Sequence, residues 1–196
     1  MAKTLEFFYD FGSPATYLAH TQMPGLAERT GARVRYRPML LGGVFKATGN
    51  QSPVVIPAKA AHLMGADLPR FARRYGVAIK VPPGFPVNTL ALMRGAVVAE
   101  EEDCAEAYIS AMFRALWVEA RNLAEPETVA AVLSAAGLDA KVFLSRVGEQ
   151  AIKDKLKANT EEAVARGAFG APTFFVGREM FFGQDRLDFV EEALAA

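Results

Sequence analysis

The sequence predicts an α/β protein in which a long helical segment separates two parts of a small β-sheet. A strand, a helix and a second strand are indicated within the first 37 residues. From about residue 42 to residue 167 the pattern is helical, and the last 30 residues return to short strands and a final helix. We therefore expect an α/β fold with a large all-helical insertion.

The start of the chain predicts a parallel β-α-β unit. Residues 5–9 form an apolar strand, which turns at Gly12 and enters a helix at Ser13-Pro14. Proline suits the first helical turn because its missing N–H would have no helical partner there, and Gly31 is expected to end this helix. Residues 34–37 then predict the second strand. This order favours a parallel pair joined by a right-handed crossover.

The middle of the chain predicts helices interrupted by prolines. Apolar residues such as Tyr108, Met112 and Leu116 recur at helical spacing. The expected breaks are at Pro53, Pro57, Pro69, residues 81–86 and Glu125-Pro126. We expect two domains, one formed by residues 1–42 plus 168–196 and the other, the inserted helical domain, by residues 43–167.

The end of the chain predicts two short strands and a helix. Residues 173–176 are aromatic and β-branched, a turn follows at Gly177-Arg178, and a second short strand comes next. Asp185 is expected to open the last helix, where its carboxylate and that of Asp188 would face the positive end of the helix dipole. Together with Ser13-Pro14, this layout resembles a thioredoxin-type fold whose redox cysteines are absent.

Composition favours a small-molecule partner. The chain has 196 residues, of which 52% are hydrophobic, and its 22 basic and 22 acidic residues give a formal charge of zero. Such a balance supports neither a nucleic acid nor a membrane surface as partner, and no apolar run reaches the ~20 residues that cross a bilayer. The single cysteine, Cys104, cannot form an internal disulfide, and no signal segment precedes the first strand, so we expect a cytoplasmic protein. His20 and His62 lack metal-ligand spacing, and no metal is expected.

Five motifs occur in order along the chain: Phe8-Tyr-Asp-Phe-Gly-Ser-Pro14, Thr48-Gly-Asn50, Phe85-Pro-Val-Asn-Thr89, Phe169-Gly-Ala-Pro-Thr173 and Gly183-Gln-Asp-Arg-Leu187. In these motifs the chain resembles the DsbA-like proteins that comprise 2-hydroxychromene-2-carboxylate isomerases and kappa-class glutathione transferases. The resemblance covers nearly the whole chain. It implies a thioredoxin-like fold with a DsbA-like helical insertion, glutathione as the cofactor, and a homodimer.

Ser13 is the candidate catalytic residue. It stands at a strand-to-helix junction, where free N–H groups favour negative charge. By resemblance, its hydroxyl would face the thiol of glutathione and stabilise the thiolate, whereas the local sequence alone favours a simple helix cap. Residues 13–16, where a disulfide oxidoreductase carries Cys-x-x-Cys, have no cysteine. The thiol must therefore come from the cofactor.

The other candidate residues follow from the same resemblance, each beside a structural alternative. A cis bond at Ala171-Pro172 would present the backbone of Ala171 to glutathione, although an ordinary edge-strand proline is the alternative. Asp185 and Arg186 suit the oppositely charged groups at the γ-glutamyl end of glutathione. The structural alternative is that Asp185 caps the last helix and Arg186 is a solvated surface side chain. The remaining candidates are Lys59 for a glutathione carboxylate, Asn50 for the ligand or its own turn, and Asn88 and Arg94 for the substrate, with Asn88 equally suited to capping a helix.

The resemblance implies a glutathione-dependent isomerase that converts 2-hydroxychromene-2-carboxylate to trans-o-hydroxybenzylidenepyruvate by reversible thiolate addition. A kappa-like transferase and a non-catalytic glutathione- or peptide-binding module are the alternatives. One departure concerns the substrate side. The isomerases have two tryptophans before the Gly-x-Asp-Arg motif, where this chain has Phe181-Phe182, and residues 85–89 are closer to the kappa transferases.

Overall fold

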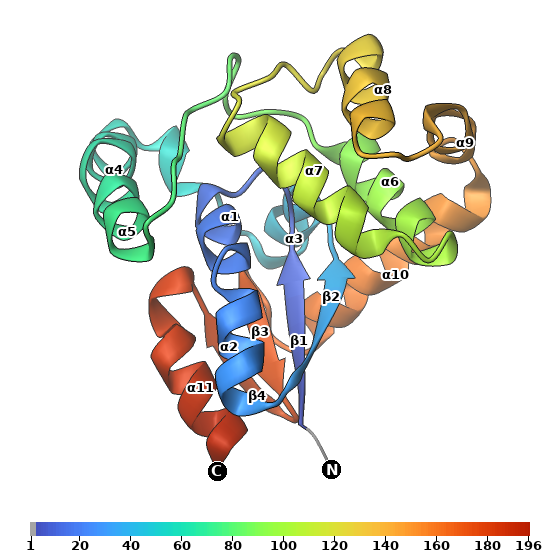
Figure 1. The fold of residues 1–196 in the computed structure, drawn as a ribbon. Helices are drawn as coiled ribbons and strands as arrows, with labels where there is room; N and C mark the ends of the chain where they lie inside the picture. The colour runs from blue at the N-terminus through green and yellow to red at the C-terminus, as the bar shows by residue number, and fades with distance from the viewer. Residues whose placement is uncertain (1–2) are drawn as a thin grey trace.

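Four strands form a mixed sheet in the computed structural model, which describes residues 3–196 (Figure 1). Their order is β2-β1-β3-β4, with β1 parallel to β2 and antiparallel to β3, and β3 antiparallel to β4. The strands are β1 (Thr4–Tyr9), β2 (Arg33–Pro38), β3 (Thr173–Val176) and β4 (Glu179–Phe182). The predicted strands and the parallel first pair are confirmed.

The predicted first helix is in fact two helices, α1 (Pro14–His20) and α2 (Met23–Thr30). Pro24 lies in the first turn of α2, and because proline has no N–H to donate, the helix ladder cannot continue through it. Gly31 ends α2 as expected, with φ +66° and its N–H bonded to the Ala27 carbonyl at 2.8 Å.

The helical insertion lies between β2 and β3. It contains α3 (Leu41–Thr48), a 3-10 turn (Pro53–Val55), α4 (Pro57–His62), a π-helical segment (Leu63–Asp67), α5 (Leu68–Tyr75), α6 (Leu90–Glu101), α7 (Ala105–Trp117), α8 (Pro126–Ala135), α9 (Ala140–Arg146) and α10 (Gln150–Ala165). The expected break at Pro69 is wrong, since Pro69 sits in the first turn of α5 and the helical path runs on from Pro57 to Tyr75. No helix within residues 3–196 is long and apolar enough to span a membrane.

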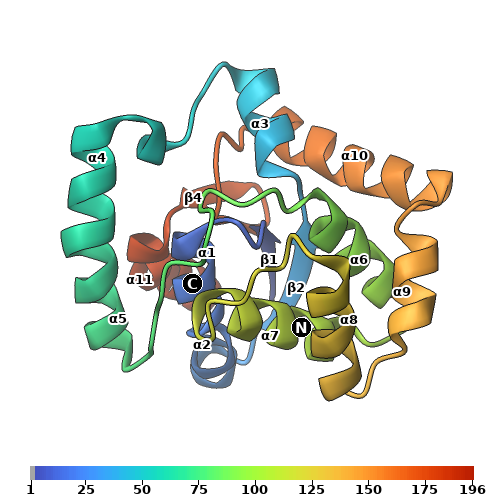
Figure 2. The ribbon, with the colours of Figure 1, turned by 90° about the horizontal axis from the view of Figure 1, so that it is seen from above.

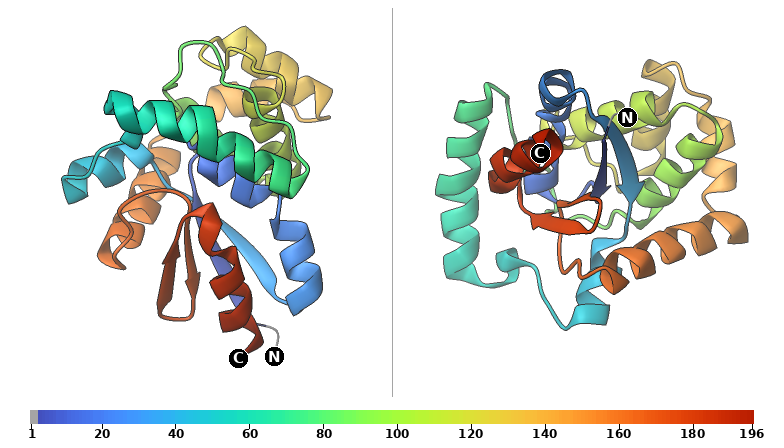
Figure 3. Two further views of the ribbon diagram at one scale, coloured as in Figure 1. Left: turned by 90° about the vertical axis from the view of Figure 1, so that its left-hand side faces the viewer. Right: turned by 90° about the horizontal axis from the view of Figure 1, so that it is seen from below.

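The helices of the insertion lie on two sides of α1. Figure 2 shows α4 and α5 on one side of α1 and α6 to α10 on the other, joined by the extended segment 76–89. Below this layer the sheet is covered on both faces, by α1, α2 and α11 on one and by α3 and α10 on the other (Figure 3).

The final helix, α11 (Leu187–Ala195), begins two residues later than expected. Asp185 belongs to a preceding 3-10 turn, Gln184–Arg186, and no side chain caps α11. The prediction that Asp185 opens this helix is therefore wrong, whereas Asp188 does lie in its first turn. The carboxylate of Asp185 pairs instead with Arg186.

One aromatic core joins the sheet to the insertion. From β1, the side chains of Phe7 and Tyr9 point to one face, where Phe7 stacks on Phe174 with ring centroids 4.9 Å apart. Two residues further on, the ring of Phe11 packs edge-on against that of Phe113 of α7, with the ring centroids 4.8 Å apart. The indole N–H of Trp117 donates to the Phe11 carbonyl at 2.8 Å. The division into two domains stays a prediction, and this buried cluster runs across both parts.

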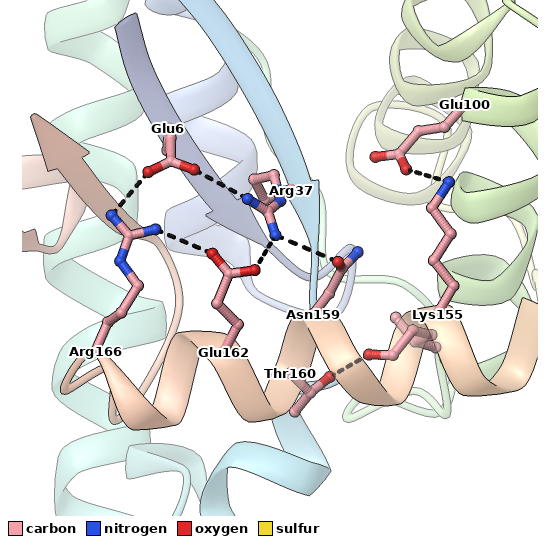
Figure 4. A network of polar contacts seen from close by, with 9 residues as sticks. Glu6, Arg37, Glu100, Lys155, Asn159, Thr160, Glu162 and Arg166 are labelled. Atoms are coloured by element: carbon pink, nitrogen blue, oxygen red, sulfur yellow. Dashed lines mark hydrogen bonds and ion pairs between the residues drawn. The ribbon is translucent and has the colours of Figure 1, made fainter. Parts of the chain in front are cut away.

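The other face of the sheet is tied to α10 by charged side chains (Figure 4). Arg37 of β2 donates to Glu6 of β1 at 2.9 Å and pairs with Glu162 of α10, and its side chain is only 10% exposed. Arg166 bonds Glu6 at 2.7 Å and lies 3.8 Å above the ring of Phe175. The end of the insertion is thereby fixed to β1, β2 and β3.

The partly buried imidazole of His20 makes stability depend on pH. Burial lowers its pKa from 6.5 to about 4, and its Nδ1 lies 2.8 Å from the Tyr36 hydroxyl. Below pH ~6.5 His20 is protonated in the unfolded chain, whereas in the folded chain it stays neutral until the pH approaches about 4. Stability is therefore lost as pH falls through this window.

We expect the free energy of unfolding of the wild type to fall by about 2 kcal/mol more between pH 7 and pH 5 than that of His20→Phe, measured by urea unfolding. Phenylalanine retains the stacking on Phe113 and cannot titrate. The carboxyl groups titrate in both proteins, so the difference isolates His20. His62→Gln, at an exposed histidine, should keep the wild-type dependence; identical pH curves for wild type and His20→Phe would contradict the assignment.

Candidate functional site

The five sequence motifs meet in one cleft. It has a volume of about 550 Å³ and is lined by residues from the β1–α1 turn, the start of α3, the loop at 50–54, the segment 85–90 and the turns beside β3 and β4. A larger groove of about 1110 Å³ runs along β2 and α7 and contains no residue of these motifs. The smaller cleft is therefore the candidate site, because segments far apart in sequence converge there.

Ser13 is nearly buried in this cleft and makes two hydrogen bonds. As the N-cap of α1, its Oγ accepts from the Thr16 N–H at 3.2 Å, and its hydroxyl donates to the Ala171 carbonyl at 3.0 Å. The capping alternative is thus confirmed, and Ser13 also lines the cleft. The second bond joins the beginning of the chain to the turn that precedes β3.

Asp10 is a buried carboxylate three residues before Ser13. Its Oδ1 accepts from the Gly12 N–H at 2.9 Å and the Thr89 hydroxyl at 2.7 Å, and its Oδ2 accepts from the Leu41 N–H at 2.8 Å. Burial raises its pKa, while these three bonds act in the opposite direction. Sequence reasoning did not single out Asp10, although an acidic residue directly after a buried strand was a detectable signal.

The Ala171-Pro172 bond is cis, as the resemblance implied, and Phe85-Pro86, which was not singled out, is cis as well. Both prolines line the cleft. The Pro172 carbonyl accepts from the Gly183 N–H at 3.0 Å. This bond holds the turn before β3 against the turn after β4.

Asp185 lines the cleft, whereas Arg186 does not. The two side chains form a partly exposed ion pair at 2.7 Å. Gly183 has φ +103°, and a Cβ there would lie 2.5 Å from Asp185 Oδ1. Glycine is therefore required for this carboxylate to reach the cleft.

The other candidates divide into two groups. Asn50 and Asn88 line the cleft, with Asn50 Nδ2 donating to the Phe169 carbonyl at 2.8 Å and Asn88 Oδ1 accepting from the Leu90 N–H at 3.0 Å. The side chain of Asn50 thus ties its loop to the segment before β3. Asn88 satisfies the N–H of the first residue of α6, although Thr89 is the N-cap of that helix and has no side-chain cap bond. Lys59 is exposed on α4, and Arg94 lies on α6 with a buried Nε that has no partner among the described residues. Neither lines the cleft.

Two aromatic rings stand at the rim of the cleft. Phe182, which lines it, and Phe169 pack with centroids 4.5 Å apart, and they are 40% and 38% exposed. A Cβ at Gly170 would lie 2.7 Å from the Phe182 ring, so this glycine permits the pair. In residues 3–196 no group of three or more His, Cys, Asp or Glu side chains is placed to hold a metal ion.

Comparison with known proteins identifies similar chains. A family model described as DSBA-like thioredoxin domain matches residues 4–195. The 2-hydroxychromene-2-carboxylate isomerase of Sphingobium xenophagum is 34% identical over 99% of both chains, and glutathione S-transferase kappa 1 of Rattus norvegicus is 26% identical over 95% of this chain and 88% of its own. A solved structure of 2-hydroxychromene-2-carboxylate isomerase superposes with a TM-score of 0.88 at 31% identity, covering 97% of this chain and 94% of that one. The predicted DsbA-like thioredoxin fold is confirmed.

Replacing Asp10 should destabilise the protein by about 1–3 kcal/mol, because Asp10→Asn turns one acceptor into a donor and leaves a buried N–H or hydroxyl without a partner. Chemical denaturation of the purified variant measures this change. Asp154→Asn, at an exposed residue that accepts only from Gln150, is the matched control and should be neutral within ~0.5 kcal/mol. Equal losses in the two variants would show that the three bonds of Asp10 contribute nothing specific.

Proposed function

Because the chain belongs to the family of DSBA-like thioredoxin domains, we propose that it is a glutathione-dependent isomerase whose cleft holds the glutathione thiol against Ser13. The observation that carries the proposal is the position of the Ser13 hydroxyl, buried in a cleft where all five motifs meet. Relatives named as isomerases and as glutathione transferases support an enzyme with this cofactor.

The thiol has to be supplied by the ligand. Ser13 and Thr16 stand where a dithiol oxidoreductase would carry its cysteines. Cys104 precedes α7, lies outside the cleft, and has a pKa raised by burial. A free tripeptide thiol bound beside Ser13 fits this chemistry.

Ser13 can stabilise a thiolate by exchanging one hydrogen bond for another. The only proton of the Ser13 hydroxyl goes to the Ala171 carbonyl. When glutathione binds, the hydroxyl would turn to the sulfur, and the cysteinyl N–H of glutathione would take its place on the Ala171 carbonyl, as in an added strand. A hydrogen bond to the charged form lowers the thiol pKa from its usual ~8.5 and raises the reactive fraction at neutral pH.

The remaining contacts to glutathione are assigned by charge. Asp185 would accept from the γ-glutamyl ammonium, and the side-chain amides of Asn50 and Gln184, which also line the cleft, would hydrogen-bond the tripeptide. Lys59 and Arg186 would approach the glutathione carboxylates from outside the lining. Asn88 and Arg94 are the corresponding proposals for the substrate.

The reaction follows from reversible addition. Glutathione, when bound beside Ser13, would supply reversible addition of its thiolate to a conjugated carbon of a ring-opened aromatic substrate, so that the former double bond could rotate as a single bond before the thiolate leaves. For 2-hydroxychromene-2-carboxylate the product would be trans-o-hydroxybenzylidenepyruvate, and the protein contributes positioning and stabilisation of charge.

A kappa-like transferase, which would keep the C–S bond and consume glutathione, is the second candidate. It is favoured by the motif at residues 85–89 and by relatives named kappa transferase. The predictions of a non-catalytic binding module, a homodimer and a cytoplasmic location remain predictions.

Ser13→Ala should raise the pKa of bound glutathione by about one unit or more and lower turnover at least tenfold near neutral pH, because the thiolate loses its hydrogen-bond donor. Ultraviolet difference absorbance of the thiolate, titrated against pH, measures the first effect. Ser110→Ala, at an exposed serine outside the cleft, should behave as the wild type. A thiolate titration that is unchanged in Ser13→Ala refutes the assigned role.

The fate of glutathione separates the two candidate activities. For an isomerase, we expect total free thiol to stay constant within error over hundreds of turnovers of a cis-configured aryl enone, while the trans product accumulates. Thiol titration and chromatography of the same samples provide the measurement. Loss of one thiol per product formed would assign the chain to the transferases.

A further inference from the structure

The outer edge of β2 is open. β2 is the outermost strand on its side of the sheet, and no strand within residues 3–196 pairs with its free edge (Figure 1). The N–H of Arg33 donates to the carbonyl of Lys3, directly before β1, at 2.9 Å, and the other odd-numbered residues of β2 bond to β1 in the same way. Because successive residues of a strand bond to opposite sides, Val34 and Tyr36 direct their N–H and C=O groups away from the sheet. These backbone groups can pair with a further strand.

The larger groove, of about 1110 Å³, runs along this edge and has an apolar side. Val34 and Tyr36 line the groove, are partly exposed, and pack against the aromatic core. From α2 and α7, the side chains of Met23, Ile109 and Phe113 line the same space. Every second side chain of an added strand would point to this side and could be removed from water there.

The other face of the β2 edge is basic. Arg33, Arg35 and Arg37 take the alternate positions of β2, so their side chains lie on the face opposite to the apolar pair. Arg37 is buried and pairs with Glu6 and Glu162. Arg33 and Arg35 are exposed, and neither forms an ion pair with another residue of the described chain. Two unpaired cations thus stand beside the open backbone edge.

The carboxylates that line the groove come from other elements. Glu100 of α6 pairs with Lys155 of α10 at 3.4 Å, and Asp103 and Glu106 lie just before and within the first turn of α7. The strand itself therefore presents only positive charge to a partner.

A second copy of this chain does not suit the edge. Two β2 strands paired about a twofold axis would run antiparallel and would bring the arginines of one copy opposite those of the other. Like charges directly opposite one another destabilise a strand pair. The arginines therefore oppose self-association at this edge, whereas they attract a strand of opposite charge.

We propose that β2 binds an extended acidic segment of another protein by adding it to the four-stranded sheet as a further strand. Acidic residues of the segment face Arg33 and Arg35, and the apolar residues that alternate with them lie in the groove against Val34 and Tyr36. The backbone bonds supply affinity, and the alternation of side chains supplies selectivity. This site is separate from the cleft that contains Ser13 and does not depend on glutathione.

A fluorescently labelled peptide, Thr-Glu-Val-Glu-Val-Glu-Thr, tests the proposal by anisotropy with the full chain. We expect its Kd to be at least tenfold lower than that of the peptide with lysine in place of glutamate, because lysine would be repelled by Arg33 and Arg35. A peptide of the same composition with its three glutamates consecutive should also bind at least fivefold more weakly, because it cannot place acidic and apolar side chains on opposite faces.

Two variants test the backbone edge and the charge separately. Val34→Pro removes one outward N–H and leaves the bonds of β2 to β1 in place, a position where edge strands tolerate proline; it should weaken binding of the acidic peptide at least fivefold. Arg35→Glu leaves the backbone unchanged and should shift the ratio of the two Kd values at least tenfold towards the lysine peptide. Arg178→Glu, in the exposed β3–β4 turn outside the groove, and Ser13→Ala should both bind as the wild type.

Equal Kd values for the three peptides, or unchanged binding in Arg35→Glu, would overturn the proposal. Sedimentation of the wild type without peptide provides a further check. A dimer that dissociates in Val34→Pro would assign the edge to a second copy of the chain and would also overturn it.

Discussion

The geometry of the cleft depends on the buried carboxylate of Asp10. Its three hydrogen bonds reach the β1–α1 turn, the first residue of α3 and the residue before α6. These are the points where the sheet-bearing part of the chain and two separate helices of the insertion come together. Because burying a carboxylate without hydrogen-bond donors costs free energy, the three bonds of Asp10 couple the positions of these three segments. One side chain thereby positions the β1–α1 turn that carries Ser13 and the two segments of the insertion that line the cleft.

Ser13 links the other end of the chain to the same point. Its oxygen closes the first turn of α1, and its proton reaches across to the turn before β3, 158 residues later. The capping and ligand-binding interpretations of this serine do not compete, because the lone pair serves one and the proton serves the other. A thioredoxin-like site can thus keep its helix start intact with serine at this position.

The sequence predicted the strands and their parallel first pair because hydrophobic patterning and glycine and proline positions are local signals. It missed the division between α1 and α2 and the 3-10 turn at Gln184–Arg186, where a single proline or a non-local contact decides the local backbone. Motifs recognised by resemblance did converge on one cleft. Asp10 escaped notice because its importance lies in partners 31 and 79 residues away, and the placement of Lys59 and Arg94 outside the lining depends on how the insertion packs.

The aromatic core that crosses from the sheet into α7 places a spectroscopic reporter next to the cleft. Trp117 is the only tryptophan of the chain, it is fully buried, and its indole N–H is fixed to the Phe11 carbonyl. Its ring centroid lies 5.6 Å from that of Phe85, which lines the cleft. Tryptophan emission from this protein therefore comes from one rigid, water-shielded indole that packs against a residue of the cleft. The wavelength and intensity of its emission therefore depend on the packing of this one ring beside Phe85, and they can be followed without a label.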